Sequence, residues 1–290
     1  MPQTTLDEVV DLVSTGDEVY LGGFGYNQPF AVAHELIRRG VGDLRVVRAS
    51  GDVLLDQLVG AGLVEETVTA HCWNAIGPTP THAFRRAVED GDPRPLAVEE
   101  FGLGDLLLRF FAGARRLPFV PAGPAPGTGQ FEHRVHEEKY TPVEFDGETH
   151  HVVRPMNPSI GFVHVHRADE RGNAQLRGPK AELRHAALAC ETLIVTAEEV
   201  VPAGDLRETP ELTTVPGFHV DGVVEVPGGS HPSGVAGYYE RDVPYLEYYG
   251  ETTETAASFE AYLDEWVYGV PDRAAYLERV EREGFGEVVA

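Results

Sequence analysis

Short apolar runs alternate with amphipathic segments along most of the chain. The run 44–47 has the length and the apolar character of a buried strand, whereas the segment 29–39 places Phe30, Ala33 and Ile37 on one face of a helix. Strands that alternate with helices imply right-handed crossovers and therefore parallel neighbours. The pattern predicts an α/β fold with an open, mostly parallel sheet and helices on both faces.

The same periodicity predicts where the individual elements lie. Strands are expected over 18–21, 44–47, 67–70, 96–99, 151–154, 160–166 and 193–196. Helices are expected after the capping box Thr5-Leu6-Asp7-Glu8 and over 29–39, 53–61, 81–89, 105–115, 181–190, 259–267 and 274–283. No internal repeat divides the chain, so residues 1–290 are expected to form a single domain.

Prolines and glycines interrupt this alternation in the middle of the chain. The stretch 117–128 cannot be helical, and it is long for a simple connection. A polar segment follows, in which Glu144-Phe145-Asp146-Gly147-Glu148-Thr149 has the form of a β-hairpin. We therefore expect a covering loop and a hairpin at about 117–150.

The first predicted strand runs into a glycine turn, Gly22-Gly23-Phe24-Gly25, which is followed by Asn27-Gln28-Pro29. Three glycines in four positions leave backbone N–H groups uncovered by side chains, which suits a phosphate, a carboxylate or a developing oxyanion. The alternative is a tight connection between strand and helix with no ligand. The spacing is that of neither a dinucleotide fingerprint nor a P-loop.

Two glutamates, Glu99 and Glu100, lie where another predicted strand ends, and Gly102 follows them before the next helix. Ligands of open α/β sheets bind at the carboxyl ends of the strands. A glutamate in this position is ionised at neutral pH and can attack a thioester without a separate base. The alternative is a solvated pair of carboxylates at a strand end.

Two histidines, His164 and His166, alternate with valines and therefore point to the same side of a predicted strand. A metal pair is conceivable, but zinc usually requires a third protein ligand, and no helical H-E-x-x-H spacing lies nearby. We expect hydrogen-bonded histidines and no metal site. The segment Asp169–Asn173 that follows is expected to form a compact turn with Gly172 at positive φ.

A second stretch of small residues, Val226–Gly234, contains Gly228, Gly229 and one histidine, His231. Such a loop can admit a ligand or another protein chain, or it can simply reverse the chain. Its local chemistry does not distinguish between these possibilities.

Composition narrows the class of partner. The chain has 47 acidic and 23 basic residues, for a formal charge of -24, and Lys139 and Lys180 are its only lysines. Nucleic acid is therefore not expected as a partner, since binding it requires clustered cations. An acidic, lysine-poor surface is typical of a folded protein kept soluble by charge, and we expect a halophilic protein from a salty cytoplasm.

Cellular location is suggested by the cysteines and by the apolar runs. Cys72 and Cys190 form no C-x-x-C pattern and are expected to be core residues in a reducing compartment. No signal segment opens the chain, and no apolar run approaches the ~20 residues needed to cross a bilayer. We expect a cytoplasmic protein that does not contact a membrane.

Together these segments resemble the A (alpha) subunit of class I CoA-transferases, in particular the glutaconate CoA-transferase branch. The resemblance is carried by Gly22–Gly25 with Pro29, Ala97–Gly102, Arg116–Pro121, Pro158–Asn173, Val195–Val200 and Pro227–Pro232. It implies a CoA-transferase/NagB-like fold, a homologous B (beta) subunit in a heterodimer or heterotetramer, and an active site between the two chains. It also implies acyl-CoA and a carboxylic acid as substrates, coenzyme A as cosubstrate, and no tightly bound cofactor.

The resemblance further implies a mechanism in which a glutamate carries CoA as a glutamyl-CoA thioester. Backbone N–H groups of the glycine turns would stabilise the oxyanions, so Gly22, Gly23, Phe24, Gly25, Asn27, Gln28 and Gly102 are the candidate CoA-binding or oxyanion residues. Such transferases usually carry the nucleophile in a Ser-Glu-Asn-Gly-type segment of the B (beta) subunit, and this chain has no such segment. The alpha subunit is therefore expected to be inactive on its own.

Two departures from the family pattern keep other functions open. The glycine turn has Asn27-Gln28 where a glycine usually lies two residues before the proline, so the acyl specificity does not transfer. A related branch of two-subunit proteins opens a steroid-derived ring of a CoA ester with a glutamate near the position of Glu100, which makes Glu100 the candidate catalytic residue of an alternative acyl-CoA or ring-opening hydrolase. A non-catalytic CoA-binding module is the second alternative.

Overall fold

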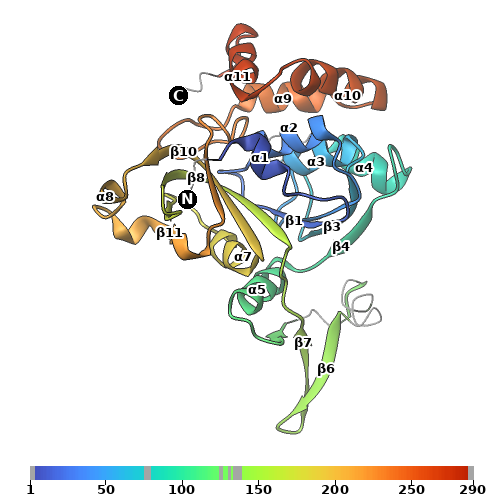
Figure 1. Cartoon of the computed structure of the whole chain (residues 1–290). Helices are drawn as coiled ribbons and strands as arrows, with labels where there is room; N and C mark the ends of the chain where they lie inside the picture. Colours follow the sequence, from blue (N-terminus) through green and yellow to red (C-terminus); the bar gives the residue numbers. More distant parts are fainter. Residues whose placement is uncertain (1–3, 75–79, 124–126, 130–131, 133–138, 287–290) are drawn as a thin grey trace.

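The computed structural model of the protein describes residues 4–74, 80–123, 127–129, 132 and 139–286. Seven parallel strands form its centre (Figure 1). In spatial order they are β12 (Gly222–Glu225), β10 (Thr192–Val201), β8 (Ile160–Asp169), β1 (Glu18–Leu21), β2 (Leu44–Val47), β3 (Val64–Thr69) and β4 (Ala97–Glu100). The predicted open and mostly parallel sheet is therefore confirmed.

Two short strands extend the sheet in the antiparallel direction at the end of β8. They are β9 (Ala174–Gln175) and β11 (Thr213–Val215). The turn between β8 and β9 has the predicted Asx form, because the Asp169 carboxylate accepts the N–H groups of Arg171 and Asn173, both at 2.9 Å. Gly172 has a φ of 87°, as its place in the turn predicts.

Helices lie on both faces of the sheet. One face is covered by α1 (Leu6–Val10), α2 (Phe30–Arg39), α3 (Val53–Gly60) and α4 (His82–Glu89), and the other by α5 (Leu103–Ala114) and α7 (Leu183–Ala189). Alternation along β1 shows the division, since Val19 and Leu21 join the first core whereas Tyr20 joins the second. No helix in the described part of the chain has the length and apolar character needed to cross a membrane.

Three C-terminal helices form a further layer above α1–α4 (Figure 1). They are α9 (Val243–Thr252), α10 (Ala256–Leu263) and α11 (Arg273–Arg282), and a π-helical turn, Asp264–Tyr268, follows α10. The expected helix 259–267 is therefore divided at Leu263. Tyr245, Trp266 and Tyr276 are fully buried in the core that this layer shares with α2 and α3.

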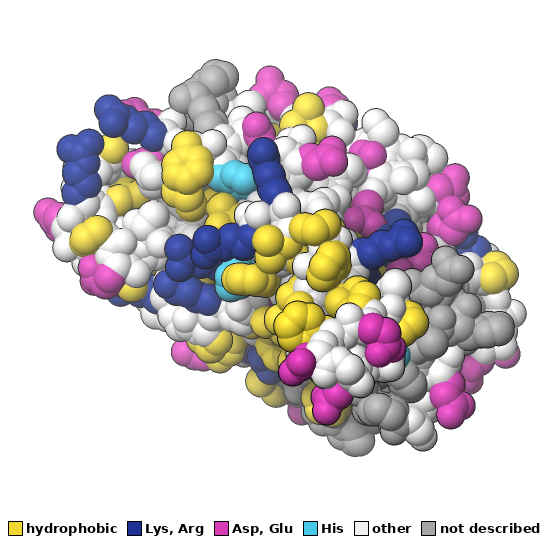
Figure 2. Space-filling view, turned by 90° about the horizontal axis from the view of Figure 1, so that it is seen from below, with side chains coloured by type: hydrophobic (Ala, Val, Ile, Leu, Met, Phe, Trp, Pro, Cys, Tyr) yellow, Lys and Arg dark blue, Asp and Glu magenta, His cyan; other side chains and the backbone are white. Residues whose placement is uncertain are grey.

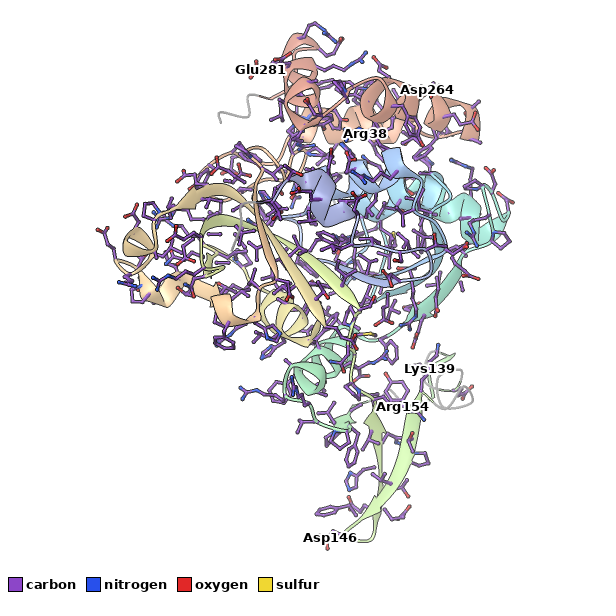
Figure 3. All side chains as sticks on the ribbon, viewed as in Figure 1. Arg38, Lys139, Asp146, Arg154, Asp264 and Glu281 are labelled. Carbon is purple, nitrogen blue, oxygen red and sulfur yellow. The ribbon has the colours of Figure 1, made fainter. Side chains whose placement is uncertain are left out.

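A small antiparallel sheet projects from the body beside α5. It contains β5 (Val120–Ala122), β7 (Glu148–Val153) and β6 (Tyr140–Phe145) in that spatial order. The predicted hairpin is confirmed, with Asp146 and Gly147 at φ values of 51° and 78° in its two-residue turn. Figure 3 shows Asp146 at the far tip. The expected covering loop lies partly outside the described residues, and a covering role stays a prediction.

The connection after β10 contains three short helical turns, α8 (Ala203–Leu206), Pro210–Leu212 and Gly217–His219. Both cysteines are free thiols. Cys190 is buried against the sheet, as predicted, whereas Cys72 is only partly buried at the end of β3.

Candidate active site

The glycine turn follows β1 at the carboxyl end of the sheet. Gly23 and Gly25 have φ values of 93° and 72°, and Asn27 also lies in the left-handed region at 56°. A Cβ atom on Gly23 would lie 2.6 Å from the carbonyl oxygens of both Tyr26 and Asn27. Only glycine therefore fits at Gly23, and the turn folds back on itself closely enough to bring its own peptides together.

Only some backbone N–H groups of this turn donate hydrogen bonds to other described residues. The N–H groups at its two ends are bonded, from Gly22 to the carbonyl of Phe162 at 2.9 Å, from Asn27 to the carbonyl of Gly234 at 2.9 Å, and from Gln28 to the Ser230 hydroxyl at 2.8 Å. The N–H groups of Gly23, Phe24 and Gly25 have no acceptor among the residues that the structure describes. These consecutive donors are therefore not used by the described part of the protein, and their use by a ligand stays a prediction.

The loop Val226–Gly234 packs against this turn. Besides accepting the amides of Asn27 and Gln28, it donates the Ser233 hydroxyl to the carbonyl of Gly25 at 3.1 Å. A Cβ on Gly229 would lie 2.7 Å from the His164 ring, so glycine allows the close approach. The loop supports the glycine turn, a role that its sequence did not reveal and that goes beyond chain reversal.

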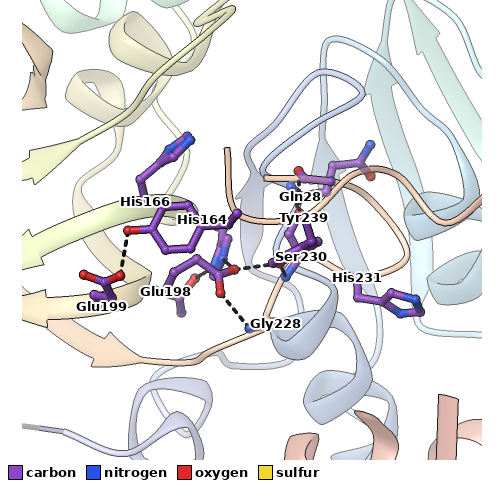
Figure 4. A network of polar contacts seen from close by, with 12 residues as sticks. Gln28, His164, His166, Glu198, Glu199, Gly228, Ser230, His231 and Tyr239 are labelled. Atoms are coloured by element: carbon purple, nitrogen blue, oxygen red, sulfur yellow. Dashed lines mark hydrogen bonds and ion pairs between the residues drawn. The ribbon is translucent and has the colours of Figure 1, made fainter. Parts of the chain in front are cut away.

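A buried network holds that loop against β8 and β10 (Figure 4). The Glu198 carboxylate lies 2.6 Å from Nε2 of His164, and it accepts the Tyr239 hydroxyl at 2.6 Å and the N–H of Gly228 at 2.7 Å. Burial raises the pKa of Glu198, but the bond from His164 and the other donors outweigh it and hold the pKa below its ordinary value. Glu198 is therefore a carboxylate that anchors the loop.

Both strand histidines are hydrogen-bonded, as predicted. Nδ1 of His164 lies 2.9 Å from the Thr196 hydroxyl, and Nε2 of His166 lies 2.9 Å from the carbonyl of Ala236. Within the described ranges no three His, Cys, Asp or Glu side chains are grouped as a metal site would require. Glu198 and Tyr239 were not candidates in the sequence. The parallel pairing of Thr196 with His164 places Glu198, two residues further along β10, close to the His164 ring.

His231 holds the other end of the loop. Its ring lies 2.9 Å from both the Tyr276 hydroxyl and the Asp242 carboxylate. Arg273 donates to the carbonyls of Gly228 at 3.0 Å and of His231 at 2.7 Å. Burial lowers the pKa of His231 to about 4, with the nearby Arg273 contributing in the same direction. A neutral ring thus fixes the loop to α9 and α11.

Acid is expected to weaken this anchor. The folded pKa of about 4 lies below the ordinary 6.5, so below pH 6.5 the unfolded chain binds a proton that folded His231 does not. The stability of the folded protein therefore falls as the pH is lowered. Asp56, whose pKa burial raises to about 6, acts in the opposite direction. The deficit of His231→Gln against the natural protein in urea unfolding should therefore shrink by about 1 kcal/mol between pH 7.5 and 5.5. A constant deficit would contradict the neutral ring.

A narrow pocket opens beside the turn. It is lined by the apolar side chains of Phe30, Val53 and Leu246 together with Gly25, Gln28, Asp52, Asn74, Ser233 and Arg241. The amide nitrogen of Gln28 donates to Asp52 at 2.6 Å, but its Oε1 is buried without a hydrogen-bond partner among the described residues, and so is Nδ2 of Asn27. The candidates Gly25, Asn27 and Gln28 are therefore together in space.

Glu100 and Gly102 lie elsewhere along the same end of the sheet. They belong to β4 and the start of α5, and β4 is three strands from β1, a separation of about 14 Å at the backbone. The Glu100 side chain is exposed. The structure thus does not bring Glu100 and Gly102 next to the glycine turn.

Glu99 has a structural environment of its own. It is 6% exposed and is paired with Arg45, with Arg109 at 3.4 Å and with Lys139 at 3.5 Å. Burial raises its pKa, but Arg109, Arg45 and Lys139 together lower the pKa below its ordinary value. The alternative of a solvated glutamate pair is therefore wrong for Glu99, which is a partner in an ion-pair network on the α5 face.

Known proteins align with this chain over nearly its whole length. A sequence model of the coenzyme A transferase family matches residues 3–226. The A chain of 3-oxoadipate CoA-transferase from Pseudomonas knackmussii is 34% identical, over 95% of this chain and 97% of that protein. The crystal structure of glutaconate CoA-transferase from Acidaminococcus fermentans superimposes with a TM-score of 0.89 at 27% identity, over 97% of this chain and 93% of that one.

A relative with another activity is also similar. The IpdA subunit of the cholesterol ring-cleaving hydrolase of Rhodococcus jostii is 29% identical over 92% of both chains. The family match covers well over half of the chain, and the most similar of these relatives is a transferase subunit. The predicted resemblance is therefore confirmed, and the chain belongs to the coenzyme A transferase family, in which it is homologous to the alpha chains of the two-subunit enzymes.

Proposed function

We propose that this chain is the alpha subunit of a cytoplasmic CoA-transferase that moves CoA between an acyl-CoA and a carboxylic acid. The observation that carries the proposal is the row of three unused N–H groups, on Gly23, Phe24 and Gly25, at the carboxyl end of β1. Preorganised backbone donors of this kind stabilise the oxyanion that forms when a thioester carbonyl is attacked. The narrow pocket beside Gln28 would receive a small group of the acyl or acid substrate.

The chemistry proceeds by two exchanges at one glutamate. The carboxylate attacks the thioester carbonyl, the carbon–sulfur bond breaks, and CoA leaves as a thiolate while the acyl group and the glutamate form a mixed anhydride. The thiolate then attacks the glutamyl carbonyl, which releases the first acid and leaves a glutamyl-CoA thioester. The acceptor acid reverses these steps and departs as the new acyl-CoA. Every step passes through a tetrahedral oxyanion that the turn can stabilise.

We propose that the beta subunit supplies this glutamate. Glu99 is engaged in ion pairs, and Glu100 lies three strands from the turn. Exposed apolar side chains offer surface that a second subunit would bury, among them Leu103 of α5, Phe119 just before β5 and Phe145 of β6. Figure 2, which views the molecule from that side, shows hydrophobic side chains gathered among basic ones. A heterodimer or heterotetramer fits this surface.

The experiment that tests the proposal is an exchange assay on the co-purified two-subunit complex. A panel of short and dicarboxylic acyl-CoA donors is offered with free acids, and ping-pong kinetics are expected. Hydroxylamine should trap the enzyme thioester and stop turnover. Binding of CoA without any turnover on the whole panel would contradict the proposal and support a non-catalytic CoA-binding module instead.

The similarity to a ring-cleaving hydrolase favours one alternative, in which Glu100 is catalytic. Glu100→Gln separates the two functions. If the nucleophile is on the beta subunit, the complex should keep its exchange rate to within about threefold, whereas losing a catalytic carboxylate costs about 10⁴-fold or more. Glu65→Gln is the matched control, since Glu65 is also an exposed glutamate on a strand of the same sheet, β3. A large loss confined to Glu100→Gln would favour the hydrolase.

A further inference from the structure

Arg48, the residue that follows β2, is buried beneath the glycine turn and is 1% exposed. Its Nη1 donates to the carbonyls of Leu21 and Gly22 at 2.9 and 3.3 Å, and its Nη2 donates to the carbonyl of Gly23 at 3.3 Å. Its Nε donates to the carbonyl of Ser50 at 3.1 Å. One guanidinium thus gathers three consecutive carbonyls of the β1 end and its turn.

This arrangement sets the direction of the amides. In a trans peptide the C=O of one residue and the N–H of the next point in opposite directions. When the carbonyls of Leu21, Gly22 and Gly23 point at Arg48, the N–H groups of the three following residues point away from it. The first, on Gly22, is taken by β8. The N–H groups of Gly23 and Phe24 remain, and they face away from the guanidinium.

Burial of this cation also gives the turn a positive potential. The nearest carboxylate is Asp52, whose Oδ2 lies 3.5 Å from Nη2 of Arg48. That carboxylate is shared, because it also accepts the side chain of Gln28 at 2.6 Å and the N–H of Leu54 at 3.1 Å. The guanidinium therefore remains a partly compensated charge behind donors that face away from it, which favours an anion in front of them.

We propose that Arg48 is a positioning residue for the anion-binding amides of the glycine turn. It does not touch the ligand. It holds the peptides of Gly22, Gly23 and Phe24 in the orientation that an oxyanion requires, so its contribution appears when charge develops on the thioester oxygen. The kinetic part of this inference rests on the proposed transferase function, whereas the orientation of the peptides does not.

The kinetic test uses Arg48→Met and Arg48→Lys in the co-purified complex. Arg48→Met should lower kcat about 10²-fold, the usual loss for one oxyanion donor, with KM for acyl-CoA changed less than about threefold. Arg48→Lys keeps the charge and some donors and should fall between the natural protein and Arg48→Met. Rates are normalised to the amount of folded complex, so that a loss of stability does not count as a loss of activity.

Arg86→Met is the matched control. Arg86 also binds two backbone carbonyls, of Thr253 and Glu254, but at α4 and the C-terminal layer. The Arg86→Met complex should have a lower free energy of unfolding and an unchanged kcat. The inference is overturned if Arg48→Met keeps the natural kcat, or if it changes only KM. Should Arg48→Met not fold, a natural kcat in Arg48→Lys together with an altered KM overturns it equally.

A crystal structure of Arg48→Lys or Arg48→Met provides a readout that needs no turnover. The peptide joining Gly23 to Phe24 should rotate, because nothing then holds its carbonyl inward, and glycine at Gly23 permits the rotation. An unchanged turn in Arg48→Met would overturn the positioning role even in a complex that exchanges CoA. A rotated turn in a complex that never exchanges CoA would instead contradict the proposed function alone.

Discussion

Purified without its beta subunit, the chain is expected to show no detectable CoA exchange, and mixing the two chains is expected to restore the activity. The chain supplies donors at Gly23, Phe24 and Gly25, but among its described glutamates Glu99 is held in ion pairs and Glu100 is distant from them. Without a nucleophile near these N–H groups no tetrahedral oxyanion forms, so there is nothing for them to stabilise. The restored rate should exceed that of either chain in isolation by about 10⁴-fold or more.

The measurement pairs light scattering with the exchange assay, on the two separate chains and on their mixture. Activity should follow the mass of the mixed species as one chain is titrated with the other, and it should saturate at equal molar amounts. A monomer of this chain that catalyses exchange without a partner would contradict the proposal, because it would need a nucleophile of its own. The isolated beta chain is the matched control, and it too is expected to be inactive.

Local patterns predicted the elements of the fold well, because periodicity and capping act over a few residues. The capping box of Thr5 and Glu8 is present, and α2 begins directly after Pro29. The left-handed pair Asp146 and Gly147 forms the hairpin turn. At each of these positions the residue types favour one local backbone structure.

The candidate site was only partly predictable, because its contacts join segments that are distant in sequence. Periodicity showed that the glycine turn ends a strand, but not that Ser230 and Gly234, some 200 positions away, would take the amides of Gln28 and Asn27. The order of strands, which puts β4 three places from β1, decides that Glu100 lies far from the turn. The local pattern around Arg48 also does not predict that its side chain is buried against three backbone carbonyls.

Replacing Glu198 by Ala is expected to lower the free energy of unfolding by about 3–5 kcal/mol, because several buried hydrogen-bond donors lose their charged acceptor. The carboxylate accepts the Tyr239 hydroxyl and the N–H of Gly228, and it pairs with His164 at 2.6 Å. Truncation leaves the buried donors of Gly228 and His164 without an acceptor, and each such group costs about 1–3 kcal/mol. Urea unfolding at pH 7.5 measures the change.

The next residue along β10 is the matched control. Glu199 has an exposed side chain whose one described contact is the Tyr238 hydroxyl at 2.9 Å, so Glu199→Ala should change stability by less than about 0.5 kcal/mol. Equal losses in the two variants would show that the buried network contributes nothing. The double variant His164→Ala with Glu198→Ala should cost less than the sum of the single changes, since each single change already removes the pair.

The same substitution links stability to the site. Glu198 binds Gly228, and two residues further along that loop Ser230 accepts the amide of Gln28. Freed from Glu198, the loop should shift and carry Gln28 with it, so exchange per folded complex should fall in Glu198→Ala and stay unchanged in Glu199→Ala. A variant that is less stable but fully active when folded would show that the loop holds its place through His231 and Arg273 alone.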